Sequence, residues 1–409
     1  MKKAVVTVLG LSKFEAIYSS DISNIVLKNK NYHNMFELLC ENISDEYKIV
    51  PFYTKEAFKS QKNFFDKYKD KITLCDECLI DENNFKDILK YFDNIINQFD
   101  KVIIDVTNGL RHIPILVTID MIMQNIKQPD KIENIIFGKM EEDSRITKEK
   151  YSVYKIIDIK EYLELANLSF VITNFQDNYT ISKHIKIKSE KYQILVDKMD
   201  KFSSDIMSLS IENLLVNSAI KLKKAITDIT DDKDTILLNE LEALYTHIDT
   251  IFTKQEHRYI TYYELAKVLK EKGYLIHSLA LIFEAIGFYL KTNFKTYDKS
   301  LEEFINRKES DIKSNSKLDY YKLIDGCRSF LFFNIDKNKN KFFNKNHIQI
   351  IYDKLNVENI EDFKKFASRV KKLRNNLLHA NSGNILNNTQ KDIDKVLSDF
   401  EKYCINNHI

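Results

Sequence analysis

The distribution of proline divides this chain into two regions of different architecture. All three prolines, Pro51, Pro114 and Pro129, lie in the first third of the 409 residues. Because proline removes a backbone hydrogen-bond donor and interrupts helices, a long stretch without it can form uninterrupted helices. The sequence therefore predicts alternating strands and helices in its first part and a helical architecture in the remainder.

The first region contains short runs rich in valine and isoleucine, separated by helical patterns that are clearest at 84–98 and 112–126. Strands of this composition that alternate with helices indicate a mainly parallel sheet covered on both faces. We therefore expect an α/β Rossmann-like N-terminal domain. Its predicted strands are 4–10, 47–53, 71–75, 101–107, 132–138 and 153–159.

Helical periodicity dominates the second region, which we expect to be an all-α domain. The charged, asparagine-rich stretch 300–350 is expected to form loops and short helices. The division predicted from these patterns is an α/β domain at 1–178, a helical linker region at 179–256 and a helical domain at 257–409. The expected helices are 161–175, stretches within 188–256, a hairpin at 262–295 broken at Gly273, 360–380 and 389–404.

Charge and cysteine content narrow the class of protein. Lysine and arginine total 62 against 60 aspartates and glutamates, so any nucleic-acid site must be a local patch. Five cysteines, an odd and sparse set, argue against a disulfide scaffold and for a reducing compartment. Cys75 and Cys78 form a CxxC, but no second cysteine pair or nearby histidine completes a zinc site, so no metal is expected.

The N-terminal sequence lacks the long apolar run of a signal peptide. No segment stands out as long and apolar enough to span a membrane. We therefore expect a cytoplasmic protein without a membrane partner.

Polar turns follow several of the predicted strands, at 10–13, 54–55, 107–112 and 138–139. In a parallel sheet, ligands bind outside the carboxyl ends of the strands, which is where these turns are expected. Neither GxGxxG nor GxxxxGK[ST] occurs, which argues against an ordinary dinucleotide or P-loop site. A different ligand must therefore account for the polar turns.

A helix near the C-terminus carries residues suited to cleaving RNA. The segment 363–379, FKKFASRVKKLRNNLLH, places apolar residues three and four positions apart, as on a buried helix face. Beside that stripe, Arg374, Asn375 and His379 can converge on one patch of surface. An imidazole can transfer protons near neutral pH, and a guanidinium can stabilise charge on a phosphate. The spacing alone is common by chance, and a solvated helix face is the alternative.

The segment Asp105–Pro114, DVTNGLRHIP, follows a predicted strand and opens a helix. It resembles the D-[VI]-T-x-G-[LF]-R-x-x-P signature of CRISPR-associated proteins with a CARF domain, a CRISPR-associated Rossmann fold. TVLGLSKFE resembles the first strand and ligand loop of that domain. NIIFGKMEED resembles its later turn, and VYKIIDIKEYLELANLSFVITNF resembles the segment that closes it.

The later sequence resembles the ribonuclease part of the same family. YYELAKVLKEKGYLIHSLALIFEAIGFYL resembles the helical hairpin that opens its HEPN domain, and Arg374–His379 matches the R-x(4–6)-H signature of HEPN ribonucleases. The resemblance covers most of the chain, whereas 180–255 match only in being helical. It implies a CARF-like cyclic oligoadenylate sensor domain at 1–178 and a HEPN-like ribonuclease domain at 257–409.

The resemblance implies a homodimer that takes part in antiviral type III CRISPR defence. Two sensor domains would form one pocket for a cyclic oligoadenylate, tetra-adenylate or hexa-adenylate, as allosteric activator with no further cofactor. Two HEPN domains would form one cleft that cuts single-stranded RNA without a metal. The implied catalytic residues are Arg374, Asn375 and His379, and the implied ligand-binding residues are Gly10, Ser12, Lys13, Thr107, Asn108, Gly109 and Lys139.

Local chemistry agrees with such a pocket. Gly109 permits a turn that other residues would strain, and Thr107, Asn108 and amides at the start of the following helix can hold phosphate or ribose oxygens. Asp105 is expected to orient the turn, because a carboxylate facing a phosphate would repel it. A tight strand–helix connection without any ligand is the structural alternative.

Two other classes of function remain open from the sequence. A CARF-type transcription regulator would need a DNA-binding helix-turn-helix, and no clear basic recognition helix is found in 180–255. A non-catalytic nucleotide-sensing dimer would carry an idle HEPN motif. Whether the sensor domain also degrades its activator, as a ring nuclease, is not decided by any residue pattern.

Overall fold

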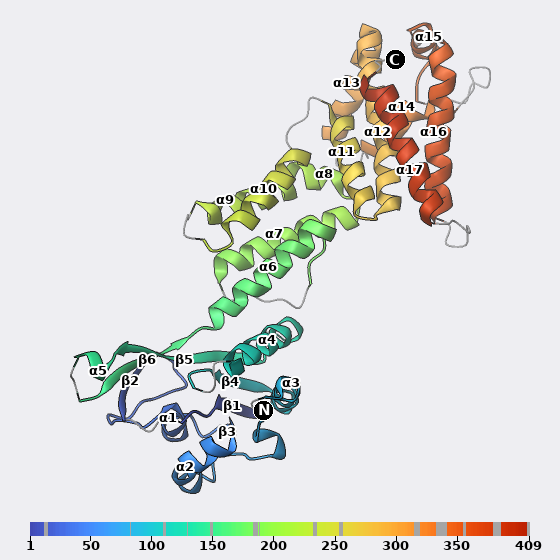
Figure 1. Cartoon of the computed structure of the whole chain (residues 1–409). Helices are drawn as coiled ribbons and strands as arrows, with labels where there is room; N and C mark the ends of the chain where they lie inside the picture. The colour runs from blue at the N-terminus through green and yellow to red at the C-terminus, as the bar shows by residue number, and fades with distance from the viewer. Residues whose placement is uncertain are drawn as a thin grey trace. The chain divides into compact units, whose positions relative to one another are not determined.

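A computed structural model describes most of the chain (Figure 1). The chain forms two compact units: an N-terminal unit, Met1–Ser203 with Asp228–Leu241, and a C-terminal unit, Ser204–Thr227 with Glu242–Ile409. The three-part division predicted from the sequence stays a prediction. The described residues are 1–11, 15–81, 83–108, 112–128, 130–147, 150–182, 187, 189–231, 235–252, 257–314, 320–332, 342–354, 357–378 and 386–406.

The N-terminal unit contains a six-stranded sheet in the order β2-β6-β5-β4-β1-β3. Neighbouring strands are parallel except for β5 and β6, which are antiparallel. The mainly parallel, Rossmann-like sheet predicted from the sequence is therefore confirmed. The strands are β1 (Lys3–Val8), β2 (Ala16–Ser20), β3 (Tyr47–Phe52), β4 (Lys101–Asp105), β5 (Ile132–Glu142) and β6 (Ser152–Asp158).

Two of the strand assignments differ from the prediction. The run 71–75 forms no strand, because Ile72 makes a single bridge to Ile49 before a 3-10 turn begins at Asp76. The sulfur atoms of Cys75 and Cys78 lie 3.1 Å apart at this turn. Strand β2 was not predicted, because it has five residues and only the first of them is buried.

Helices cover both faces of the sheet, because successive residues of a strand point to opposite sides. On β4, Val102 and Ile104 belong to one buried cluster together with Phe92, whereas Ile103 belongs to a second cluster together with Phe36. Helices α3 and α4 contribute to the first cluster, and α1 and α2 to the second. The helices of this part are α1 (Met35–Asn42), α2 (Lys55–Lys67), α3 (Phe85–Asn97), α4 (His112–Lys127), α5 (Ser144–Thr147) and α6 (Lys160–Asn178).

The C-terminal unit is helical over the residues described, as predicted. Gly273 has φ +83°, a left-handed conformation that ends the first helix of the predicted hairpin. Over its described residues, the stretch 300–350 contains more helix than expected. The helices that follow α6 are α7 (Glu190–Met207), α8 (Ile211–Asn213), α9 (Ala219–Thr230), α10 (Leu238–Phe252), α11 (Arg258–Glu271), α12 (Leu275–Tyr297), α13 (Lys299–Ser314), α14 (Tyr320–Ser329), α15 (Lys345–Lys354), α16 (Val357–Leu378) and α17 (Leu386–Phe400).

Helices α12 and α14 run antiparallel, and residues at successive turns of the two helices contact each other. Lys291 Nζ donates to the Tyr320 hydroxyl at 2.8 Å, and one turn earlier on α12 Gly287 meets Ile324. A Cβ at Gly287 would lie 2.4 Å from Ile324 Cγ2 and 3.0 Å from its carbonyl oxygen. Glycine is therefore required at this crossing for the two backbones to approach so closely.

Helix α12 is long and apolar enough to cross a membrane by length and composition alone, which the sequence analysis did not expect. Of its most apolar window, 67% is buried inside the protein. Several other helices pack against it, so the apolar residues have protein neighbours. This is the pattern of a central helix in a helical core.

In Gly287→Ala the added methyl group meets Ile324, an overpacking that costs about 1–3 kcal/mol. The gain in helix propensity offsets about 1 kcal/mol of this cost, so the C-terminal unit is expected to lose up to about 2 kcal/mol of stability. Urea unfolding of the full chain measures the effect. Thr296→Ala, at an exposed position of the same helix, is the control and should change stability by less than about 0.5 kcal/mol. A Gly287→Ala protein as stable as the control would contradict the close approach.

Candidate functional sites

The carboxyl ends of the parallel strands β1 and β4 lie beside each other in the sheet. Strands β3 and β4 flank β1 on opposite sides, so between these two strands the chain crosses from one side of β1 to the other. At such a reversal the loops after the two strands separate and leave a crevice. The predicted ligand residues Gly10 and Thr107 follow these two strands directly.

Asp105, the last residue of β4, orients the turn that follows it. Its carboxylate is fully buried, accepts a hydrogen bond from the Thr7 hydroxyl at 2.6 Å and accepts another from the Thr107 amide at 2.9 Å. Burial raises the pKa of Asp105, and the hydrogen bonds from Thr107 and Thr7 oppose that rise. The carboxylate faces into the protein, which agrees with the orienting role expected from the sequence.

Thr107 also ties β4 to β5. The Gly138 amide donates to Thr107 Oγ1 at 2.8 Å, and a Cβ at Gly138 would lie 2.9 Å from Thr107 Cγ2. The sequence analysis placed 138–139 in a turn, and this was wrong. Both residues lie inside β5, opposite Ile156 and Lys155 of β6, because β5 continues beyond the end of β4.

Buried amides hold the start of the loop that follows β1. Gln61 Nε2 donates to the Gly10 carbonyl oxygen at 2.5 Å, and Asn34 Nδ2 donates to Gln61 Oε1 at 3.2 Å. Asn34 also caps α1, since its Oδ1 accepts a hydrogen bond from the Glu37 amide at 2.9 Å. The position of Gly10 is thereby fixed to two helices. The sequence analysis missed both amides: the Asn34-x-x-Glu37 spacing is a helix-start signal, whereas no local motif marks Gln61.

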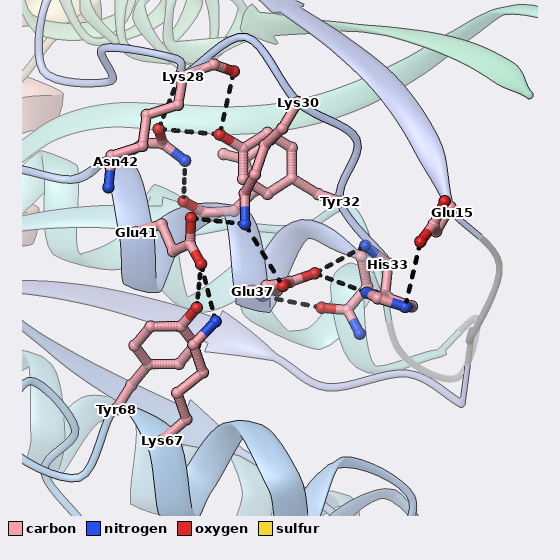
Figure 2. A network of polar contacts seen from close by, with 12 residues as sticks. Glu15, Lys28, Lys30, Tyr32, His33, Glu37, Glu41, Asn42, Lys67 and Tyr68 are labelled. Carbon is pink, nitrogen blue, oxygen red and sulfur yellow. Dashed lines mark hydrogen bonds and ion pairs between the residues drawn. The ribbon is translucent and has the colours of Figure 1, made fainter.

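The far end of the same loop is held by the neighbouring residue, His33 (Figure 2). His33 Nδ1 lies 2.9 Å from Glu37 Oε2, and its Nε2 lies 3.7 Å from Glu15 Oε1. Just beyond, the backbones of Ala16 and Tyr32 exchange two hydrogen bonds, at 2.9 and 3.0 Å. Both ends of the loop are therefore anchored to residues 32–34.

Glu41 lies deeper in the same polar network (Figure 2) and is surrounded by donors. Lys30 Nζ lies 2.7 Å and Lys67 Nζ 3.1 Å from its carboxylate, and the Tyr68 hydroxyl donates to it as well. Burial opposes ionisation, but these three partners together lower the pKa of Glu41 to about 2. Glu41 therefore stays ionised at neutral pH and secures α1 against α2.

Four of the seven predicted ligand residues are described, and they lie on neighbouring strand ends. Gly10 follows β1, Thr107 and the half-buried Asn108 follow β4, and the exposed Lys139 lies on β5. Such amides, hydroxyls and an ammonium can hold phosphate and ribose oxygens. The predicted ligand residues Ser12, Lys13 and Gly109 lie outside the described residues.

Replacement of Glu41 by glutamine is expected to lower the stability of the full chain by about 1–2 kcal/mol at pH 7, part of the interaction being screened by solvent. The folded pKa of about 2 lies below the ordinary value of 4.5, so this stabilisation is present above pH 4.5 and is lost as pH falls toward 2. Urea unfolding at pH 7, 4.5 and 3 should show that the difference in the free energy of unfolding between parent and variant decreases as the pH is lowered. Glu46→Gln, at an exposed position, is the control. A difference in unfolding free energy that does not change with pH would contradict the lowered pKa of Glu41.

The predicted motif of the C-terminal unit lies near the end of α16. Phe363, Phe366 and Val370 are buried, as the predicted stripe requires. Arg374 is half-buried beside this stripe, and its Nη2 donates to Asn375 Oδ1 at 3.2 Å. The structure thus brings these two predicted residues together. His379 lies outside the described residues.

Arg374 differs from the other half-buried or buried arginines in having no carboxylate partner among the described residues. Arg258 pairs with Glu212, Arg369 with Asp399, and Arg328 with two carboxylates. Instead, the Arg374 guanidinium lies over the Phe283 ring, with its Cζ 4.1 Å from the centroid. Its buried Nε has no hydrogen-bond partner among the described residues, as is also true of Arg328 and Arg369. A guanidinium placed against an aromatic ring without a counter-charge is suited to receive an anion.

The surroundings of Arg374 form a local basic and aromatic patch. The rings of Phe283 and Phe332 are stacked with centroids 6.5 Å apart, and the exposed Lys371 lies over Phe332 at 4.5 Å. Single-stranded nucleic acid binds to sites that combine basic groups with aromatic rings. The described residues contain no group of three or more His, Cys, Asp or Glu side chains that could hold a metal ion.

Sequence reasoning missed one further cation here, Arg328 on α14. Its guanidinium is buried and lies 3.7 Å from the centroid of the same Phe283 ring. Nothing in the local sequence YYKLIDGCRS marks this arginine, because only the packing of α14 against α12 brings it to the ring.

No protein-family model and no curated protein sequence matches this chain. Among solved structures, it is similar to Csm6 of Enterococcus italicus bound to cyclic hexa-2'-fluoro-hexa-dAMP. The sequence identity is 12%, the match covers 99% of this chain and 95% of that chain, and the TM-score is 0.38. At this identity and TM-score the likeness carries neither a ligand nor an activity over to this chain.

Proposed function

We propose that this protein is a metal-independent endoribonuclease that cleaves single-stranded RNA and is activated by a cyclic oligoadenylate, as the resemblance to the CARF–HEPN family implies. The observation that carries the proposal is the state of Arg374. It is a half-buried guanidinium on a ring, beside Asn375, and it forms no ion pair with a carboxylate among the described residues. A phosphodiester would supply the missing negative charge.

The proposed reaction is an internal transfer. His379 moves a proton between the 2′-hydroxyl and the leaving 5′-oxygen, and Arg374 stabilises the charge that develops on the phosphate. Asn375 orients the guanidinium through the hydrogen bond between the two side chains. The products are a 2′,3′-cyclic phosphate and a free 5′-hydroxyl, so no water needs to be activated by a metal.

The proposed activator site lies at the carboxyl ends of β1, β4 and β5 in a homodimer. A two-fold pocket suits a ring ligand, because the same loops read both halves. The N-terminal unit exposes large apolar side chains on two helices that contact each other, Ile115 and Ile119 of α4 and Tyr162 and Phe170 of α6. Exposed apolar residues of this kind support a subunit interface on this unit.

Arg374→Ala and His379→Ala are each expected to lower RNA cleavage by at least about a hundredfold, because the charge-stabilising or proton-transferring group is lost. Binding of the cyclic oligoadenylate should be unchanged. Lys365→Ala, an exposed position on the same helix, is the matched control for Arg374. Cleavage should persist in EDTA and leave 2′,3′-cyclic phosphate ends. Full cleavage by either variant, or a strict metal requirement, would refute the assignment.

Asn108→Ala is expected to raise the activator concentration needed for half-maximal cleavage by about tenfold, because an amide that holds phosphate or ribose is lost. The measurement compares cleavage over a titration of cyclic tetra-adenylate and, in parallel, cyclic hexa-adenylate. A bulky replacement of Gly109 should have the same effect. Asn63→Ala, an exposed asparagine on α2, is the control. Unchanged activator dependence of the Asn108 variant would count against the pocket.

A further inference from the structure

Two arginines from different helices contact one phenylalanine ring in the C-terminal unit. The Cζ atoms of Arg328 and Arg374 lie 3.7 and 4.1 Å from the centroid of the Phe283 ring. Two like charges this close repel each other unless a negative charge lies between or beside them. The residue after Phe283 on α12 is Glu284, which supplies that charge.

The two guanidinium groups are engaged very differently. Arg328 Nη1 donates to the Phe283 carbonyl oxygen at 2.8 Å and lies 3.1 Å from Glu284 Oε1, while its Nη2 lies 2.9 Å from Asp325 Oδ1. Arg374 makes one side-chain hydrogen bond, to Asn375. Arg328, with one percent exposure, thus pairs with two carboxylates and a carbonyl oxygen, although its Nε has no hydrogen-bond partner among the described residues. The half-buried Arg374 pairs with no carboxylate among the described residues and is left for a ligand.

The Glu284 carboxyl group interacts electrostatically with both arginines. Burial raises the pKa of its carboxyl group, and the positive charges of Arg328 and then Arg374 counteract that rise. A nearby cation strongly stabilises a partly buried carboxylate, because water cannot fully solvate that carboxylate. Without Arg328, the nearest remaining guanidinium for Glu284 would be Arg374.

We propose that Arg328 is a positioning residue of the ribonuclease site. By occupying the Glu284 carboxylate and holding the Phe283 ring, it keeps the Arg374 guanidinium free for the phosphodiester. This inference rests on the proposed function. A purely structural role, in which Arg328 only joins α14 to α12, makes a different prediction when Glu284 is neutralised.

The test is a double-mutant cycle on the activated full-length protein, with kcat and KM for single-stranded RNA measured separately. Arg328→Met is expected to lower kcat by about tenfold or more, because Glu284 then neutralises Arg374. In a Glu284→Gln background the same substitution should lower kcat by less than about twofold, because no carboxylate remains to capture Arg374. A merely structural Arg328 would act through its ion pair with Glu284, so Glu284→Gln alone would lower kcat and would not restore the turnover lost in Arg328→Met. In the proposed role, Glu284→Gln alone keeps kcat within about twofold of the parent and restores most of the turnover lost in Arg328→Met.

Asp325→Asn is the matched control, since it removes the other carboxylate of Arg328 and leaves the contact with Glu284 intact. Its kcat should stay within about twofold of the parent. If circular dichroism shows that Arg328→Met does not fold, Arg328→Lys replaces it and is judged by the same comparison between backgrounds. An unchanged kcat, or equal losses with and without the Glu284 charge, overturns the inference.

The failure of this inference can be told apart from failure of the proposed function. If the parent protein cleaves no RNA with either cyclic oligoadenylate, the proposed function fails and the inference falls with it. If the parent cleaves RNA and Arg374→Ala does not, while Arg328→Met keeps full turnover, the inference alone fails.

Discussion

The close approach of α12 and α14 at Gly287 determines how the C-terminal unit is built. The two antiparallel helices meet at matching turns: Lys291 with Tyr320, Gly287 with Ile324, and Phe283 with Arg328. The absence of a side chain at 287 allows the backbones close enough for the Arg328 guanidinium to reach the Phe283 carbonyl oxygen. The ring that faces Arg374 is therefore placed by a packing constraint one turn away. The stability of the core and the geometry of the proposed site depend on the same helix pair.

In the N-terminal unit, hydrogen bonds rather than close helix packing determine how the loops at the strand ends are arranged. Buried Asp105 orients Thr107, and Thr107 in turn satisfies the Gly138 amide where β5 extends past β4. Gln61 and His33 hold the two ends of the loop after β1. Polar groups at a strand end are costly to bury without partners, so such a network defines one arrangement of the loops. A ligand that binds there meets a surface that is already organised.

The sequence predicted the fold class, and the structure confirms it, because valine- and isoleucine-rich strands and long amphipathic helices have distinct periodicities. It failed where tertiary context decides. The run 71–75 has strand-like composition but makes only one bridge, at Ile72. Gly138 lies in β5, which continues beyond the end of β4. Local motifs could mark Asp105 and Arg374. They could not mark Gln61 or Arg328, whose partners are brought to them only by folding. The roles assigned to the site residues stay predictions.

The CxxC at the 3-10 turn has a chemical consequence for the segment beside β3. Burial, and next the hydrogen bond with Cys75, raise the pKa of Cys78 to about 12. At pH 7 only about one such thiol in 100,000 is ionised, and the thiolate is the form that attacks disulfides and peroxides or coordinates zinc. Although the two sulfur atoms lie 3.1 Å apart, the Cys78 thiol is a poor nucleophile at pH 7. Cys78 belongs to the buried cluster on this side of the sheet, and the half-buried Cys75 packs against that cluster.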